Sequence, residues 1–240
     1  MHPSSDSASA SGPGETRRPT RSPGRPKMPF ERIVDTALEI VDAEGADALT
    51  LRALAQRLGS STATLYRHVD NRADLLGHVV ERVFGEIKID AGALEGAEWP
   101  HACELLATAM FDAIARHPRA VPLLMETVPT GPNAMAYREL GLSILLAGGF
   151  SPAAARTLLA TLGRFVIGFA IQLRDDPDHQ QADVRAGDTL HRADPTRYPS
   201  ISLTAAAATV PLAEEFALGL DLLIRGMRSF EADHRHGGPS

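Results

Sequence analysis

The sequence has one cysteine, Cys103, among its 240 residues, so no disulfide can form within the chain. Such scarcity is typical of proteins from a reducing compartment. The first residues lack the apolar core of a secretory signal. The most apolar run, 158–173, is interrupted by Arg164 and Gln172 and is too short to span a bilayer. We therefore expect a cytoplasmic protein that contacts no membrane.

The sequence also lacks an overall excess of basic charge, since its formal net charge is −6 at pH 7. The charge is distributed unevenly, however. Residues 17–72 contain ten Arg or Lys and seven Asp or Glu, whereas residues 73–240 contain fourteen and twenty-one. This asymmetry favours a protein that meets the phosphates of a nucleic acid with one end only.

The sequence contains no phosphate-binding loop, no paired carboxylates in a supporting context and no nucleophile beside a base. Its histidines lack the spacing of metal ligands, so we expect no metal site and no cofactor. These absences favour a binding protein over an enzyme. Strand patterns and internal repeats are missing too, which predicts an all-α fold.

Helical periodicity is what the sequence does contain, and it divides the chain into three parts. Residues 1–28 are rich in Ser, Pro, Gly and Arg and predict a disordered basic arm, which is either a solvating tail or a segment that follows DNA. Residues 29–88 predict a bundle of four short helices, the second capped by Thr50 and the fourth by Asn71. After a linker, residues 99–233 predict a larger helical domain.

In the larger domain, proline and glycine mark the ends of the expected helices. The predicted helices cover residues 99–116, 133–147, 151–174 and 211–232. Residues 175–200 are rich in Asp, Pro, His and Arg and show no helical period, so we expect a long mobile loop there.

The stretch from Thr50 to Arg72 predicts a helix-turn-helix unit. Two helices that cross closely need a small residue midway along the first, a turn residue four positions later and a buried apolar residue in the second. Ala55, Gly59 and Leu65 have this spacing. The second helix, around residues 61–68, is then the recognition helix that lies in the major groove of DNA.

The outer face of this unit carries small polar groups, a tyrosine, a histidine and arginines. The two threonines can form hydrogen bonds with bases or touch a thymine methyl group, and the alanine can pack against that methyl group. The tyrosine, the histidine and the second arginine can reach phosphates, and the first arginine can reach a base or a phosphate. Taken singly, each has a structural alternative, such as partial burial or a solvated helix charge. The residues expected to contact DNA are Arg52, Thr62, Ala63, Thr64, Tyr66, His68 and Arg72.

Three segments, LTLRALAQRLG (49–59), TLYRHV (64–69) and NRADLL (71–76), resemble the N-terminal domain of the tetracycline-repressor (TetR) family of transcriptional regulators. The resemblance covers residues 29–88, and the family pattern places DNA contacts on the same seven residues. It implies a three-helix DNA-binding head, joined by a fourth helix to an all-α ligand-binding and dimerisation domain.

The helix from Ala153 to Arg174 is apolar almost all round, so other helices must cover it on several sides. With the final helix it can form half of a four-helix interface whose other half comes from a second copy. The alternative is a central core helix of a monomer. A homodimer is favoured because two recognition helices are needed to read a palindromic operator.

In such a dimer the helices within residues 99–147 can enclose a cavity for a largely apolar ligand. Lys88 and Leu124 stand where the tetracycline repressor itself has histidines that reach a magnesium-bound drug, so that ligand is not expected. The residues predicted to line the cavity are Met110, Phe111, Ile114, Leu124, Thr127, Tyr137, Phe165 and Phe169, with Arg164 and Gln172 as further polar groups.

The leading interpretation is a repressor that leaves its operator when a small-molecule effector favours a state with wrongly spaced heads. An alternative is an all-α enzyme or small-molecule carrier with a vestigial DNA-binding head. Another is an activator, or an architectural DNA-binding protein without a ligand.

Overall fold

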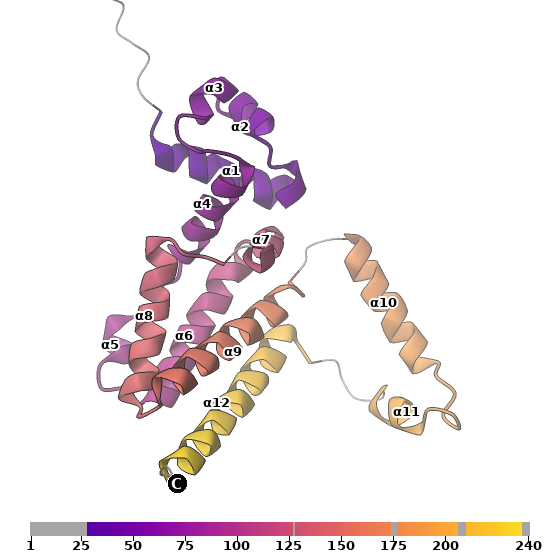
Figure 1. The fold of residues 1–240 in the computed structure, drawn as a ribbon. Coiled ribbons are helices and arrows are strands. Elements are labelled where there is room, and N and C mark those ends of the chain that lie inside the picture. Colours follow the sequence, from indigo (N-terminus) through magenta and orange to yellow (C-terminus); the bar gives the residue numbers. More distant parts are fainter. Residues whose placement is uncertain (1–27, 127, 174–176, 206–209, 237–240) are drawn as a thin grey trace, which may run out of the picture.

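The computed structural model describes residues 28–126, 128–173, 177–205 and 210–236, and their regular structure is entirely helical (Figure 1). The prediction of an all-α fold is confirmed. The expected basic arm, residues 1–28, lies outside the described residues except for Met28.

The first four helices form a small bundle, which we call the head. It consists of α1 (Phe30–Glu44), the 3-10 turn η1 (Ala46–Ala48), α2 (Leu51–Arg57), α3 (Thr62–Leu65) and α4 (Arg72–Phe84). The apolar stripe of α1 is buried against α4 and α2. The third helix was predicted over residues 61–68, but α3 is shorter, and the residues that follow it form a turn.

Polar caps explain where the short helices begin. The side chains of Thr50, Ser61 and Asn71 accept hydrogen bonds from the backbone N–H groups of Ala53, Thr64 and Asp74. Each cap satisfies a donor that the first turn of a helix leaves without a partner. The caps predicted at Thr50 and Asn71 are confirmed.

The turn between α2 and α3 requires glycine, because Gly59 has φ 60°, in the left-handed region. The turn brings Leu54 of α2 and Leu58, which caps the end of α2, beside Leu65, and all three side chains are buried. The predicted helix-turn-helix seam is thus present.

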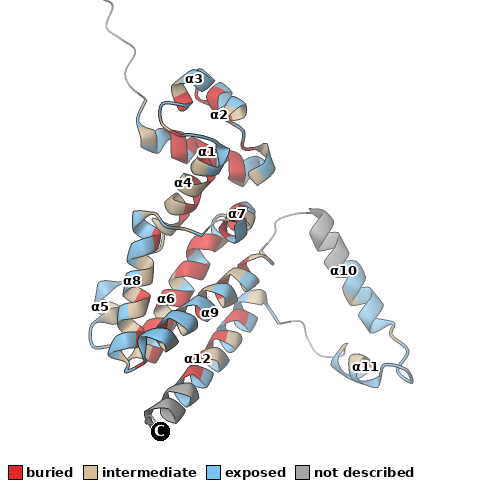
Figure 2. Cartoon of the chain, viewed as in Figure 1, coloured by how far each residue is buried: buried red, intermediate tan, exposed pale blue. Residues whose placement is uncertain are grey.

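Helices α6–α9 and α12 form the larger part of the molecule, with α6 at its centre, and we call them the body. α6 packs against α8, α9 and α12, and most of its inward residues are buried (Figure 2). The head rests on the body through α4, which contacts α6, α7 and α8, and through α1, which contacts η2. The elements are α5 (Ala91–Leu94), α6 (Trp99–Ala115), η2 (Pro118–Ala120), α7 (Val121–Glu126), α8 (Pro132–Ala147), α9 (Pro152–Ala170), α10 (Pro177–His191), α11 (Pro199–Ala205) and α12 (Leu212–His236).

The expectation of a long loop over residues 175–200 is wrong, because α10 and the start of α11 occupy this segment. Figure 1 shows both helices projecting away from the body between α9 and α12. The described residues of α10 are largely exposed, and Val184 is 67% accessible. A helix that buries no apolar stripe within its own chain leaves no periodic signal in the sequence, which explains the error.

Helix α9 is long and apolar enough to cross a membrane by length and composition alone. It packs against α6, α7, α8 and α12, however, and Leu162 and Val166 are fully buried among these neighbours. Its apolar composition is therefore explained by its place within the helical body.

Replacement of Leu65 by alanine should destabilise the head, because α3 has only this buried side chain to hold it against α2. The expected loss in the free energy of unfolding is about 2–5 kcal/mol. Circular dichroism melts provide the measurement, and Arg67→Ala, at an exposed position of the next turn, is the control. Equal melting of the two variants would contradict the packing of α3.

Candidate nucleic-acid interface and ligand cavity

Helix α3 lies at the end of the molecule farthest from the body, with its outer face open (Figures 1 and 2). Thr62 and Ala63 are exposed, and the Tyr66 side chain is 58% accessible. Thr64 is half-buried, and its Oγ1 lies 3.0 Å from Oγ of Ser61. Three of the expected contact residues thus form one accessible surface, with Thr64 at its edge.

The other three expected DNA contacts differ in how they are held. His68 is half-buried and its ring stacks on Phe30, with centroids 6.2 Å apart. The Arg72 guanidinium donates to the backbone oxygens of Leu49 at 2.9 Å and Ala46 at 2.8 Å, which anchors the segment before α2. Arg52 is exposed and makes no hydrogen bond or ion pair to another described residue, so its guanidinium is available to a phosphate or base.

A cavity of about 720 Å³ lies where the lower end of α4 meets α6, α7, α8 and α9. Of the predicted lining residues, Met110, Leu124 and Tyr137 are in its wall, and so is Arg164. Thr127 lies outside the described residues. A wall that includes Phe84 connects this cavity directly to the head.

The remaining predicted lining residues lie elsewhere in the core. Phe111 stacks on Phe216 of α12, with centroids 4.2 Å apart and an interplanar angle of 15°. Phe165 and Phe169 pack against the same ring, at 5.5 and 5.6 Å. Ile114 is buried but is not among the residues that line the cavity. These aromatic side chains join α6, α9 and α12.

Sequence reasoning missed the main wall of the cavity, which is one face of α9. The α9 residues in the wall recur at intervals of three and four, as residues on one face of a helix do. The sequence shows this spacing but does not show which face of α9 meets the cavity. Ala160, Gly163 and Gly168 keep this wall thin, and a Cβ atom added at either glycine would meet no atom within 4 Å. The α9 residues in the wall are Arg156, Leu159, Ala160, Gly163, Arg164, Ile167, Gly168 and Ile171.

Two groups near the cavity that can ionise are held neutral. The Tyr137 hydroxyl donates to the backbone oxygen of Leu106 at 3.3 Å, and burial raises the pKa of this phenol above its usual range. Burial also raises the pKa of the fully buried Cys103 thiol to about 12, with a smaller contribution from Glu104. The thiol is therefore not a nucleophile at neutral pH.

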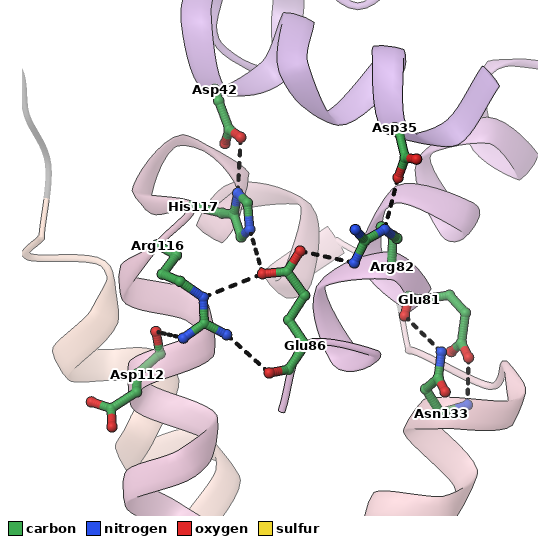
Figure 3. Close-up of polar contacts among 9 residues, drawn as sticks. All are labelled: Asp35, Asp42, Glu81, Arg82, Glu86, Asp112, Arg116, His117 and Asn133. Carbon is green, nitrogen blue, oxygen red and sulfur yellow. Dashed lines mark hydrogen bonds and ion pairs between the residues drawn. The ribbon is translucent and has the colours of Figure 1, made fainter. Parts of the chain in front are cut away.

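Charged side chains join the head to the body beside the cavity (Figure 3). His117 lies between two carboxylates, with Nδ1 2.8 Å from Oδ2 of Asp42 and Nε2 3.0 Å from Oε2 of Glu86. Its side chain is only 12% accessible. A neutral imidazole donates one hydrogen bond, so the protonated ring alone can donate to both carboxylates.

Two arginines complete what we call the Glu86 network, which consists of Asp35, Asp42, Arg82, Glu86, Arg116 and His117. Arg82 donates to Glu86 and to Asp35 of α1, both at 2.8 Å. Arg116 donates to the Glu86 carboxylate at 3.2 Å and to its backbone oxygen at 2.9 Å. Burial alone would raise the pKa of the Glu86 carboxyl, but hydrogen bonds from His117 and Arg116 and nearby positive charge hold this pKa below its usual range.

A second polar contact connects α4 with the start of α8. The Glu81 carboxylate accepts a hydrogen bond from the backbone N–H group of Asn133 (Figure 3). It accepts another from the backbone N–H group of Ala134 at 3.3 Å. A negative charge at this position also favours the N-terminal end of the α8 dipole. Tyr137 and Arg138, about one turn further along α8, line the cavity. Helix α8 therefore contacts α4 at its first turn and the cavity at its next.

Comparison with known proteins identifies the group to which this architecture belongs. Residues 33–79 match the bacterial regulatory proteins of the tetR family, and residues 92–230 match the tetracyclin repressor-like C-terminal domain. The chain belongs to the TetR family. The resemblance seen in the sequence is confirmed, and the protein is a ligand-responsive, DNA-binding transcriptional regulator.

Relatives of this TetR-family regulator match it over most of its length. The HTH-type transcriptional repressor DrrR1 of Streptomyces coeruleorubidus is 28% identical, covering 91% of this chain and 84% of its own. Tetracycline repressor protein class E of Escherichia coli is 27% identical, covering 61% of this chain and 69% of its own. The crystal structure of the Streptomyces coelicolor protein ActR with actinorhodin has a TM-score of 0.74 and 30% identity, and covers 85% of this chain and 97% of ActR.

The structural data also bear on metal binding. Within the described ranges, no three His, Cys, Asp or Glu side chains are grouped so that they could hold a metal ion. Leu124 contributes an apolar side chain to the cavity wall.

Replacement of Glu86 by glutamine should lower the melting temperature at neutral pH by several degrees, equivalent to about 1–3 kcal/mol, because it removes the charge that pairs with Arg82 and Arg116. The folded-state pKa of Glu86 is depressed, so its contribution is present above the unfolded pKa and is lost as pH falls through the folded value. The difference in melting temperature between wild type and variant should therefore shrink once the pH falls below about 4.3, the ordinary pKa of glutamate.

Melting curves between pH 7 and pH 3.5 test this expectation. Glu104→Gln is a matched control, because Glu104 lies on α6 with a side chain that is 43% accessible. A difference between wild type and Glu86→Gln that stays constant over the whole range would contradict the role of the carboxylate charge.

Proposed function

We propose that this regulator is a repressor that binds a palindromic operator as a homodimer and leaves it when a small, largely apolar effector enters the cavity. The observation that carries the proposal is the position of α4. Its first residue, Arg72, anchors the segment before α2, and its last, Phe84, lines the cavity. A ligand that moves Phe84 therefore acts on α4, the helix against which the rest of the head is packed.

The proposed DNA-binding domain comprises residues 29–88, and the ligand-binding and dimerisation domain comprises residues 99–233. Thr62, Ala63 and Tyr66 form the accessible face of α3 that would enter the major groove. Arg52 would hold the DNA from the preceding helix, whereas Arg72 and His68 would act mainly by fixing the surface. We place the protein in the cytoplasm, because a regulator must have access to its operator DNA. The basic arm, residues 1–28, precedes the proposed DNA-binding domain.

A homodimer is supported by the outward faces of α9 and α12. Leu218 and Leu222, four residues apart on α12, are about 60% accessible, although the opposite face of the helix is buried through Phe216 and Leu220. Together with the accessible side of α9, they can form a four-helix interface with a second copy. Two heads related by a twofold axis would reach half-sites roughly 34–36 Å apart.

The proposed switch needs the effector to prefer one of two positions of α4. Its free energy of binding must then differ between the DNA-competent and the released state by on the order of 1–3 kcal/mol. The Glu86 network and the contact between Glu81 and α8 supply the bonds that would have to rearrange. Several short, directional bonds that break together favour two discrete positions over a gradual tilt.

Replacement of Thr62 by alanine should weaken binding to the specific operator by about 1–3 kcal/mol and leave binding to random DNA nearly unchanged, because a base contact is lost. The operator is first selected from random duplexes by the wild-type protein, and affinities are then compared by fluorescence anisotropy. Thr204→Ala, which removes the same atoms from the exposed face of α11, is the control. If Thr62→Ala binds the selected operator as wild type does, the assignment of α3 as the recognition helix fails.

Replacement of Arg52 by alanine should have a different effect if Arg52 contacts a phosphate. Affinity should fall for specific and random DNA alike, and the slope of log K against log salt should decrease by about one. Titrations at several salt concentrations provide this slope. Arg67→Gln, an exposed arginine after α3, shows how much any lost positive charge of the head contributes. An unchanged slope for Arg52→Ala would exclude a direct phosphate contact.

A further inference from the structure

Among the described residues that line the cavity, the charged ones are all arginines. Arg138 lies on α8, and Arg156 and Arg164 lie on the facing side of α9. No Asp or Glu occurs among the described lining residues, although the whole chain contains thirty acidic and twenty-four basic residues. The cavity is therefore positive within a protein whose overall charge is negative.

Two of these arginines, Arg156 and Arg164, are exposed at the open side of the cavity and have no carboxylate partner among the described residues. Arg156 and Arg164 form neither an ion pair nor a hydrogen bond with another side chain in the described part of the chain. Elsewhere, by contrast, Arg57, Arg82 and Arg225 are each within 2.9 Å of a carboxylate oxygen. Since a guanidinium remains charged at any physiological pH, the two α9 side chains bring uncompensated positive charge to the cavity.

The third arginine is held in place by its own helix and the loop before it. Nη1 of Arg138 donates to the backbone oxygen of Pro129 and lies 4.0 Å from the sulfur of Met135. Its side chain is half-buried. A guanidinium fixed in this way loses little conformational entropy when a ligand binds to its remaining N–H groups.

The rest of the wall is apolar and large enough for a drug-sized molecule. Phe84, Met110, Leu142, Leu159 and Ile167 provide most of its surface, and a volume of about 720 Å³ lies within the usual range of ligand sites. Arg156 and Arg164 are eight residues apart, so they are separated by about 12 Å along α9. The anionic group of a ligand can therefore reach one of these arginines while the apolar part of the same ligand fills the space beside α4 and α6.

We infer that the ligand of this cavity is an amphipathic anion, with an apolar body and a carboxylate or similar group that pairs with the arginines of α8 and α9. Guanidinium groups bind such oxyanions through paired, charge-assisted hydrogen bonds. The inference rests on the proposed function only where the ligand is called an effector. Binding to the cavity can be measured without DNA.

Two fluorescent probes that share a ring system test the inference on the full-length protein. Anilinonaphthalene sulfonate carries an anionic group, whereas N-phenylnaphthylamine lacks it. The wild-type protein should bind the sulfonate at least about tenfold more tightly. In the variant Arg156→Gln/Arg164→Gln, the sulfonate should lose most of this preference while the affinity for the neutral probe stays unchanged.

Two controls locate the site and the charge effect. Gly163→Leu should weaken both probes, because its new side chain extends into the cavity from a position where Cβ meets no neighbour. Arg32→Gln removes one exposed positive charge from α1 and should change neither affinity. The inference is overturned if wild type binds both probes equally or binds neither, if the sulfonate preference survives in the double variant, or if Gly163→Leu binds as wild type does.

The outcome is separable from that of the proposed function. Operator binding by the double variant is measured in parallel by fluorescence anisotropy. A wild-type protein that prefers the sulfonate but binds no selected operator would disprove the repressor function and leave the ligand class standing. A protein that binds its operator but shows no preference between the probes would disprove the ligand class and leave the repressor function standing.

Discussion

The position of α4 is fixed by charged groups whose partners come from both parts of the molecule. Glu86, just beyond the end of α4, meets Arg116 and His117 from the body, and His117 in turn meets Asp42 of the head. Hydrogen bonds weaken steeply with distance and angle, so a small displacement of α4 breaks several of them together. The contacts that orient the head are therefore also the contacts that limit how it can move.

The cavity adjoins this charged junction because both are built on the same short helix. At its lower end, the Phe84 ring packs edge-on against Tyr137, with centroids 5.9 Å apart. At its upper end, Leu75 and Leu76 belong to the core of the head. With thirteen residues, α4 is roughly 20 Å long, so one continuous helix joins the Phe84 ring at the cavity to the core of the head.

Local interactions made the head predictable from sequence, whereas long-range packing determined the rest. Thr50, Gly59 and Asn71 act on backbone groups a few residues away, so their roles can be read from short motifs. The orientation of α9 cannot, because neighbouring residues on an apolar helix face different partners: Arg164 lines the cavity, and Phe165 packs against α12. The partners of His117 are 75 and 31 residues away, and no local pattern joins them.

The small residues on the cavity face of α9 have a consequence for how such regulators diverge. Ala160, Gly163 and Gly168 line the cavity, and the two glycines have helical backbone angles that any amino acid can adopt. Exchanges at these positions can reshape the site without disturbing the backbone or the charged junction that supports the head. A lineage could thus acquire a response to a chemically different compound by a few mutations while it keeps recognising the same genes.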